Sequence, residues 1–187
     1  TPSNSSAASD VYKRQFWDEI LQMKAGIMLR EVNPVGGFEK ANAVKEIVEK
    51  TRSKLSSVIY FGDSITDVDP FRLVREGGGL AVSFNGNQYA IREAEIAVMS
   101  HNTIIISILA DLYRKIGKEG ILRLAEEWST SSLKGICEHF LLEQIQMLPK
   151  DRAPRVEKIT PENISRLTRE SSDFRKTVRG KAIGRLG

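Results

Sequence analysis

Cysteine, histidine and long apolar runs are scarce in this sequence, and each scarcity excludes a class of protein. Cys137 is the single cysteine among 187 residues, which excludes an internal disulfide framework and a cysteine-based zinc site. The two histidines, His101 and His139, have no partners at metal-ligand spacing, so both are interpreted as structural. No uninterrupted apolar run reaches the roughly 18 residues that a transmembrane helix needs.

The amino-terminal residues lack the pattern of a signal peptide, in which a basic region precedes an apolar one. Together with the missing apolar run, this predicts a soluble, cytoplasmic protein with no membrane partner. Residues 1–15 are polar and serine-rich, and they resemble an adapter-derived leader found at the broken ends of translated metagenomic contigs. A natural disordered tail is the alternative interpretation. In either case we expect residues 1–15 to contribute nothing to the core.

Neither sign of charge dominates the composition. The 28 lysines and arginines are offset by 24 aspartates and glutamates, and the net charge of +4 does not by itself imply a nucleic-acid partner. Hydrophobic residues make up 41% of the chain, which is typical of a globular domain. The length permits one α/β core with additional helices.

Apolar runs alternate with amphipathic windows between about residues 39 and 99. The alternating segments are three apolar runs, 57–61, 80–84 and 96–99, and three amphipathic windows, about 39–55, 68–76 and 89–95. Such alternation predicts parallel strands joined by right-handed crossovers, with helices on both faces of the sheet. The predicted fold class is therefore α/β, with three layers as in Rossmann-like domains.

Helical periodicity also flanks this region. A short helix at about 16–24 and an extended segment at 27–32 are predicted before it. After it, amphipathic helices are predicted at 103–115, about 118–128 and 131–147, followed by a polar link at 149–154 and a mostly charged helix at 161–179.

The segment 57–69 carries the strongest functional signal. Its apolar strand ends at Gly62, and two acids four residues apart, Asp63 and Asp67, follow at once. Ligands bind at the carboxyl ends of strands in open α/β sheets. Glycine permits a sharp turn there, and Asp67 falls about one turn into the next helix, so both carboxylates can converge on one point. Two such hard oxygen donors suit Mg²⁺.

Two further stretches follow the order of a known family. Gly36-Gly37-Phe38-Glu39-Lys40 opens the preceding helix with a lysine near its first turn, and Val82-Ser83-Phe84-Asn85-Gly86-Asn87 follows one crossover later. Over roughly residues 30–100, the chain resembles the C-terminal part of the core of the haloacid dehalogenase-like (HAD) phosphohydrolases. It is most similar to an archaeal-type branch labelled as an energy-converting hydrogenase accessory subunit, a label that rests on gene association.

The resemblance implies a role for each site residue. Asp63 and Asp67 look like the acid pair that helps to hold Mg²⁺, and Lys40 looks like the lysine that neutralises the phosphoryl group. Ser64 and Asn85 are expected to contact a small phosphorylated substrate. These residue types fit the chemistry, because phosphoryl transfer depends on positioning and on charge stabilisation by a cation and a metal.

The same residues have structural interpretations that stay open. Asp63 can cap a helix, and an acid such as Asp67 is favoured in a first helical turn by the helix dipole. Asn85 with Gly86 is also a turn signal. A lysine in the first turn, such as Lys40, is mildly disfavoured by the dipole, which favours a functional role over a solvated face.

The family's nucleophile does not occur in this sequence. It is the first acid of an Asp-x-Asp at a strand end, which forms an aspartyl phosphate. The one Asp-x-Asp here, Asp67-Val68-Asp69, follows the metal motif and does not end a strand of its own. We therefore expect the C-terminal fragment of a Mg²⁺-dependent phosphatase that is inactive by itself. Residues 16–102 would form the C-terminal part of the HAD-like core, and 103–187 a helical extension.

A non-enzymatic accessory protein with the same fold is the alternative. It would bind a protein partner through its C-terminal helices and their basic end, which contains Arg175, Lys176, Arg179, Lys181 and Arg185. Nucleic-acid binding through this end is a weaker alternative, because no aromatic side chains are interleaved with the basic ones.

Overall fold

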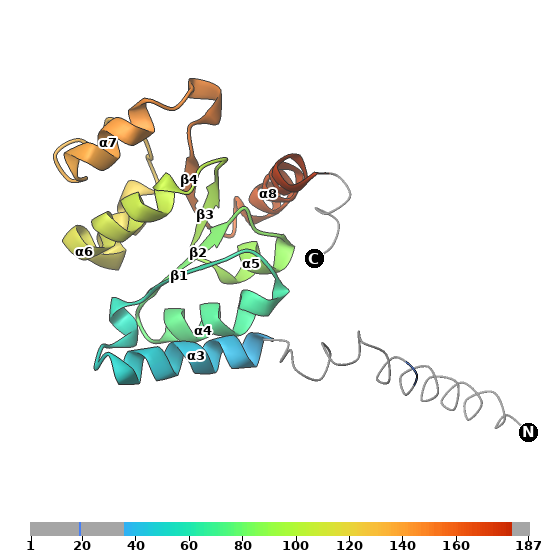
Figure 1. Ribbon diagram of the computed structural model, residues 1–187. Coiled ribbons are helices and arrows are strands. Elements are labelled where there is room, and N and C mark those ends of the chain that lie inside the picture. The colour runs from blue at the N-terminus through green and yellow to red at the C-terminus, as the bar shows by residue number, and fades with distance from the viewer. Residues whose placement is uncertain (1–18, 20–35, 181–187) are drawn as a thin grey trace, which may run out of the picture. The chain divides into compact units, whose positions relative to one another are not determined.

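The computed structural model describes residue 19 and residues 36–180, and every statement below concerns those residues (Figure 1). The predicted leader at 1–15, the helix at 16–24 apart from Glu19, and the extended segment at 27–32 lie outside them.

A four-stranded sheet in the order β1-β2-β3-β4 forms the centre of this unit. β1 (Ile59–Gly62), β2 (Leu80–Phe84) and β3 (Ile96–Met99) are parallel neighbours, which confirms the three strands predicted from the apolar runs. β4 (Arg155–Lys158) pairs antiparallel with β3. In the register of the sheet Gly62 lies beside Ser83, so the residues that follow β1 and β2 emerge at the same edge.

One face of the sheet is covered by the crossover helices α4 (Val68–Glu76) and α5 (Gln88–Glu93). Successive strands lie side by side in chain order, so right-handed crossovers place both helices on the same face. Phe71 of α4 and Ala90 of α5 pack there with Ala81 of β2. α8 (Ile164–Arg179) joins them, and α3 (Gly37–Lys50) packs on α4, on the side away from the sheet (Figure 1).

The other face is covered by α6 (Ile104–Leu124) and α7 (His139–Gln146). Alternate strand residues point to opposite faces, so Leu80 and Val82 pack against Ile108 of α6 whereas Ala81 does not. The side chains of Leu80, Val82 and Ile108 are fully buried, and each contributes roughly 1.5–3 kcal/mol through burial. The unit is therefore a three-layer α/β structure with α3 added outside.

The described part of the predicted helical extension, residues 103–180, is not purely helical. Its helices pack on both faces of the sheet, β4 adds a strand, and 36–180 lies within one compact unit with no boundary near residue 102. β4 has only one fully buried side chain, Val156, between charged neighbours, so its alternation is too short to recognise in the sequence. Its backbone pairing with β3 is supplemented by ion pairs of Arg155 with Glu170, and of Glu157 with Arg166, both of α8.

Two helix boundaries also differ from the predicted ones. α6 joins the predicted helices 103–115 and 118–128 through a kink at Gly117, whose φ is 64°. α7 begins only at His139, because turns precede it and Gly135 there has a φ of 79°. Glycine adopts this left-handed conformation without steric cost, so both glycines end or kink a helix.

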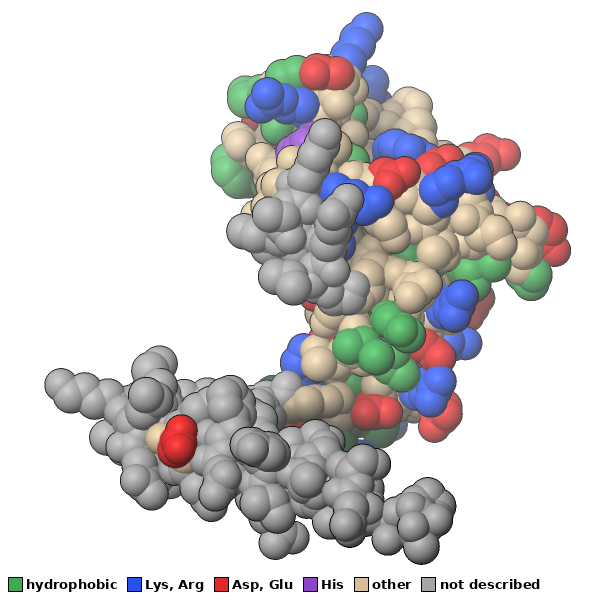
Figure 2. All heavy atoms as spheres, turned by 90° about the vertical axis from the view of Figure 1, so that its right-hand side faces the viewer, with side chains coloured by type: hydrophobic (Ala, Val, Ile, Leu, Met, Phe, Trp, Pro, Cys, Tyr) green, Lys and Arg blue, Asp and Glu red, His purple; other side chains and the backbone are tan. Residues whose placement is uncertain are grey.

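Acidic and basic side chains are interspersed over the face shown in Figure 2, with small apolar groups between them. Within residues 36–180, no helix combines the length and apolar character needed to cross a bilayer.

Candidate functional site

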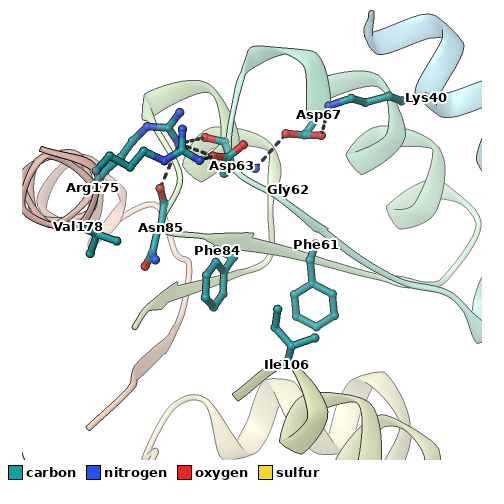
Figure 3. A pocket seen from close by; sticks show the side chains of 11 residues that line it. Lys40, Phe61, Gly62, Asp63, Asp67, Phe84, Asn85, Ile106, Arg175 and Val178 are labelled. Carbon is teal, nitrogen blue, oxygen red and sulfur yellow. Dashed lines mark hydrogen bonds and ion pairs between the residues drawn. The ribbon is translucent and has the colours of Figure 1, made fainter. Parts of the chain in front are cut away.

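A crevice of about 430 Å³ opens at the carboxyl ends of β1 and β2. Figure 3 shows its charged groups together on one side and Phe61, Phe84 and Ile106 on the other. The charged lining residues come from three parts of the chain: Lys40 of α3, Asp63 and Asp67 after β1, and Arg175 and Arg179 of α8.

Asp67 is the best-satisfied carboxylate of the crevice. Only 4% of the residue is exposed. Its Oδ1 accepts hydrogen bonds from Lys40 Nζ at 2.8 Å and from the Tyr60 hydroxyl at 3.0 Å. Its Oδ2 accepts from the backbone N–H groups of Asp63 and Ser64 at 2.9 and 3.0 Å. Asp67 therefore fixes the loop that follows β1 and orients the Lys40 ammonium.

These contacts control ionisation. Burial by itself raises the pKa of Asp67, but the hydrogen bonds from Lys40, from the two backbone N–H groups and from Tyr60 outweigh it, so the pKa lies below its usual value. Tyr60 shifts the other way, because burial and the adjacent Asp67 charge raise its pKa. At neutral pH the Asp67 carboxylate is charged and the Tyr60 hydroxyl is a hydrogen-bond donor.

Gly62 explains why this loop can close so tightly. A Cβ added at Gly62 would lie 2.5 Å from the Cβ of Asp67 and 2.9 Å from Cζ of Phe71. Any larger residue would push Asp67 away from the end of β1. The spacing Gly62-Asp63-x-x-x-Asp67 is thus a steric requirement of the turn as well as a functional signal.

Asp63 points to the opposite wall of the crevice, toward α8 (Figure 3). Its Oδ2 accepts a hydrogen bond from Nη1 of Arg175 at 2.6 Å and forms a second ion pair with Arg179. Its backbone carbonyl accepts from the same Nη1 at 2.9 Å and from the N–H of Asn87 at 2.9 Å. The two acids therefore belong to different ion pairs, one with α3 and one with α8.

The polar face of α8 is fitted to the ends of β1 and β2. Arg175 is 3% exposed, and its Nη1 also donates to the carbonyl of Asn85 at 3.2 Å. One turn earlier, the buried Ser171 hydroxyl donates to the carbonyl of Gly86 at 2.7 Å. Ser171, Arg175 and Arg179 are four residues apart and share one face of the helix.

Sequence reasoning assigned Arg175 and Arg179 to a partner-binding end and missed their place in the crevice. The available signal was their helical spacing from Leu167, the one fully buried apolar residue of this mostly polar helix. Arg175 and Arg179 follow Leu167 by eight and twelve residues, and residues at multiples of four lie close to the same face of a helix. That spacing identifies the face of α8, but it does not identify the strand ends that the face contacts.

Ser64 and Asn85 already have partners within the protein. The Asn85 amide donates to the carbonyl of Ser100 at 2.8 Å and accepts from its N–H at 2.9 Å, which ties the end of β2 to the end of β3. The Ser64 hydroxyl donates to Oδ2 of Asp67 at 3.1 Å. Asn85 lines the crevice, and substrate contact by either residue stays a prediction.

The predicted Mg²⁺ site is incomplete within residues 36–180. Mg²⁺ requires near-octahedral oxygen ligands, and the described chain has no group of three or more acidic, histidine or cysteine residues that could hold a metal. Asp67 and one oxygen of Asp63 are bonded to cationic side chains. With Lys40, Arg175 and Arg179 against two carboxylates, the crevice lining is cationic.

Comparison with known proteins extends the description of the fold. No protein-family model matches this chain, and neither does any curated protein. A solved structure that does match is described as the structure of gene product AF1437 from Archaeoglobus fulgidus. The TM-score is 0.65 at 22% identity, over 91% of this chain and 47% of that one. The likeness shows the fold alone. This chain spans about half the length of the protein that it matches.

Proposed function

We propose that this chain is the C-terminal part of a HAD-type, Mg²⁺-dependent phosphatase that hydrolyses a small phosphate ester through an aspartyl-phosphate intermediate. The observation that carries the proposal is the crevice itself, which Lys40, Asp63 and Asp67 all line at the carboxyl ends of parallel strands. This edge is where open α/β sheets bind ligands.

Lys40 has the donor capacity that the proposed role requires. An ammonium group has three N–H donors, and Nζ of Lys40 uses two, on Thr66 and Asp67, each at 2.8 Å. The Lys40 side chain is 31% exposed in the crevice. Its third donor can bind a phosphoryl oxygen, and the fixed position of the ammonium favours stabilisation of the charge that develops during transfer.

The nucleophile would come from a segment outside this sequence. Within residues 36–180, β1 pairs with β2 on one side only, and all four residues of β1 are half-buried. A parallel strand added at its other edge would end beside Asp63, because the carboxyl ends of parallel strands meet at one edge of a sheet. An Asp-x-Asp at that strand end would supply the attacking carboxylate and the acid–base group.

A HAD-fold accessory protein without activity is the second candidate. The observation that favours it is that Asp63 and Asp67 both form internal ion pairs. Arg175 is buried, so its side chain is not accessible to a docking protein partner. A partner would contact more exposed parts of the C-terminal helices, such as Lys176.

The test is an upstream-extended protein that includes an Asp-x-Asp strand, assayed with Mg²⁺ and a panel of small phosphate esters. We expect hydrolysis, and we expect Asp63→Asn to reduce it by about 100-fold. Asp173→Asn, at an exposed position of α8, is the matched control and should retain full activity. Residues 1–187 alone should not exceed a no-protein blank.

Two results would contradict this proposal. Metal-dependent hydrolysis by residues 1–187 would require a nucleophile other than the absent Asp-x-Asp. An extended protein that folds and stays inactive across the panel would favour the accessory protein.

A further inference from the structure

We propose that α8 supplies an anion-binding group to the crevice, in which Arg179 binds the phosphate of a phosphate monoester directly, opposite Lys40, and that this binding, unlike turnover, does not require a metal ion. Arg175 is a positioning residue in this arrangement. The inference rests on the proposed function for the identity of the anion, but phosphate binding can be measured without turnover.

The balance of charge in the crevice supports an anion. Lys40 lies against Asp67 at 2.8 Å, and the buried Arg175 lies against Asp63 at 2.6 Å. Arg179 shares Asp63 with Arg175, so the lining residues carry three positive charges against two negative ones. A crevice with one excess cation and low-dielectric walls attracts an anionic group.

Arg179 also has hydrogen-bonding capacity to spare. A guanidinium has five N–H donors in a planar fork, which matches two oxygens of a phosphate. Among residues 36–180, only Asp63 accepts a hydrogen bond from Arg179. The Arg179 side chain is 40% exposed and lines the crevice, so its other donors can reach a phosphate oxygen there.

Arg175 and Asp63 hold Arg179 in place. The Asp63 carboxylate accepts from both arginines on one oxygen, and Arg175 in turn is fixed by the carbonyls of Asp63 and Asn85. Only 3% of the Arg175 side chain is exposed, so its guanidinium is not free to bind a ligand directly. It therefore acts through Asp63, by keeping the carboxylate oriented toward Arg179.

The rest of the crevice fits the organic part of a monoester. Phe61, Phe84 and Ile106 form an apolar side opposite the charged groups (Figure 3). A volume of about 430 Å³ exceeds what a phosphate ion needs and lies in the range of small-molecule sites. An ester with an apolar or aromatic body would place its phosphate at Lys40 and Arg179 and its body against these side chains.

The direct test is calorimetric titration of the full chain with inorganic phosphate in EDTA-treated, metal-free buffer. We expect saturable binding that Arg179→Gln weakens by at least about tenfold. Arg179→Lys should restore part of the affinity, because it retains the charge without the fork. Lys176→Gln is the matched control: it removes the same charge from the same helix, at a residue outside the crevice, and should leave the affinity unchanged.

Two outcomes of the titration would overturn the inference: no phosphate binding at millimolar concentrations, or equal weakening by Arg179→Gln and Lys176→Gln. Circular dichroism of each variant shows whether the fold persists. Binding lost only after Arg179→Gln in a folded protein supports the site.

The extended protein separates this inference from the proposed function. If it hydrolyses phosphate esters, Arg179→Gln should raise KM about tenfold with little change in kcat, whereas a general structural defect would lower kcat as well. Hydrolysis with an unchanged KM would overturn the anion site and leave the phosphatase proposal standing. If the extended protein is inactive but still binds phosphate through Arg179, the anion site stands and the phosphatase proposal is contradicted.

Discussion

Arg175 and Asp63 are 112 residues apart in the sequence, and Nη1 of Arg175 lies 2.6 Å from Oδ2 of Asp63. The same nitrogen donates to the backbone carbonyls of Asp63 and Asn85, which follow β1 and β2. A side chain bonded to the ends of two strands is part of the crevice wall. α8 therefore belongs to the site and does not merely follow the core.

Arg175→Gln should destabilise the fold by about 3 kcal/mol, because it removes the buried guanidinium from the carboxylate of Asp63 and a hydrogen bond from each of the carbonyls of Asp63 and Asn85. Urea unfolding measures this loss. Lys176→Gln, next to it on the same helix, should change the free energy of unfolding by less than about 0.5 kcal/mol. Equal losses for the two variants would show that the Arg175 contacts are not formed in solution.

Asp67→Asn should lower stability at pH 7 by about 2–3 kcal/mol, since Lys40 would lose a buried charged partner. The folded-state pKa of Asp67 lies below its usual value, so its carboxylate stabilises the fold above the unfolded pKa of about 3.9. That stabilisation is lost as the pH falls through the folded-state pKa. The difference between wild type and variant should be constant from pH 8 to 5 and shrink below about pH 4. A difference that does not change with pH would contradict the assignment.

Gly62→Ala should cost at least about 2 kcal/mol, because the new methyl group would overlap Asp67 and Phe71. Gly36→Ala is the control, since a Cβ there meets only the flexible end of the Glu39 side chain, and its cost should stay below about 1 kcal/mol. Thermal unfolding of both variants provides the comparison. If Gly62→Ala costs no more than Gly36→Ala, the side chains of Asp67 and Phe71 must be able to move aside at little energetic cost.

Mg²⁺ should bind residues 1–187 weakly, because Asp63 and Asp67 are already paired with cations. At 10 mM, MgCl₂ should raise the free energy of unfolding by no more than about 0.5 kcal/mol relative to NaCl of equal ionic strength, and EDTA should not lower it. The measurement is urea unfolding in each salt. A larger, Mg²⁺-specific stabilisation would mean that the metal displaces Arg179 or Lys40.

The parallel part of the sheet was predictable because its signals are local. Each of its strands is an apolar run of four or five residues that ends at a turn, and α4 was predicted to its observed bounds. β4 was not predictable, because Val156 is its only fully buried residue, so four residues show no recognisable alternation of buried and exposed side chains. The other contacts of β4 are ion pairs with Glu170 and Arg166 of α8, which are distant in sequence and produce no local pattern.

The site was predictable on the side formed by α3 and β1. Asp63 and Asp67 follow one strand, and Lys40 begins the helix before it, so spacing alone places all three near one edge. Arg175 and Arg179 come from a helix whose position depends on β4 pairing antiparallel with β3. Without that strand, sequence reasoning had no means of bringing α8 to the crevice.

The position of α8 in the chain also sets the order in which the protein can mature on the ribosome. At 5–20 residues per second, the 112 residues between Asp63 and Arg175 take roughly 6–20 s to synthesise. During that interval the Asp63 carboxylate lacks its Arg175 partner, and the backbone groups at the outer edge of β3 are not paired with β4. Nascent chains stalled before β4 should therefore be cleaved faster by added protease than chains stalled after α8, because β4 and α8 cover the edge of β3 and the Asp63 carboxylate.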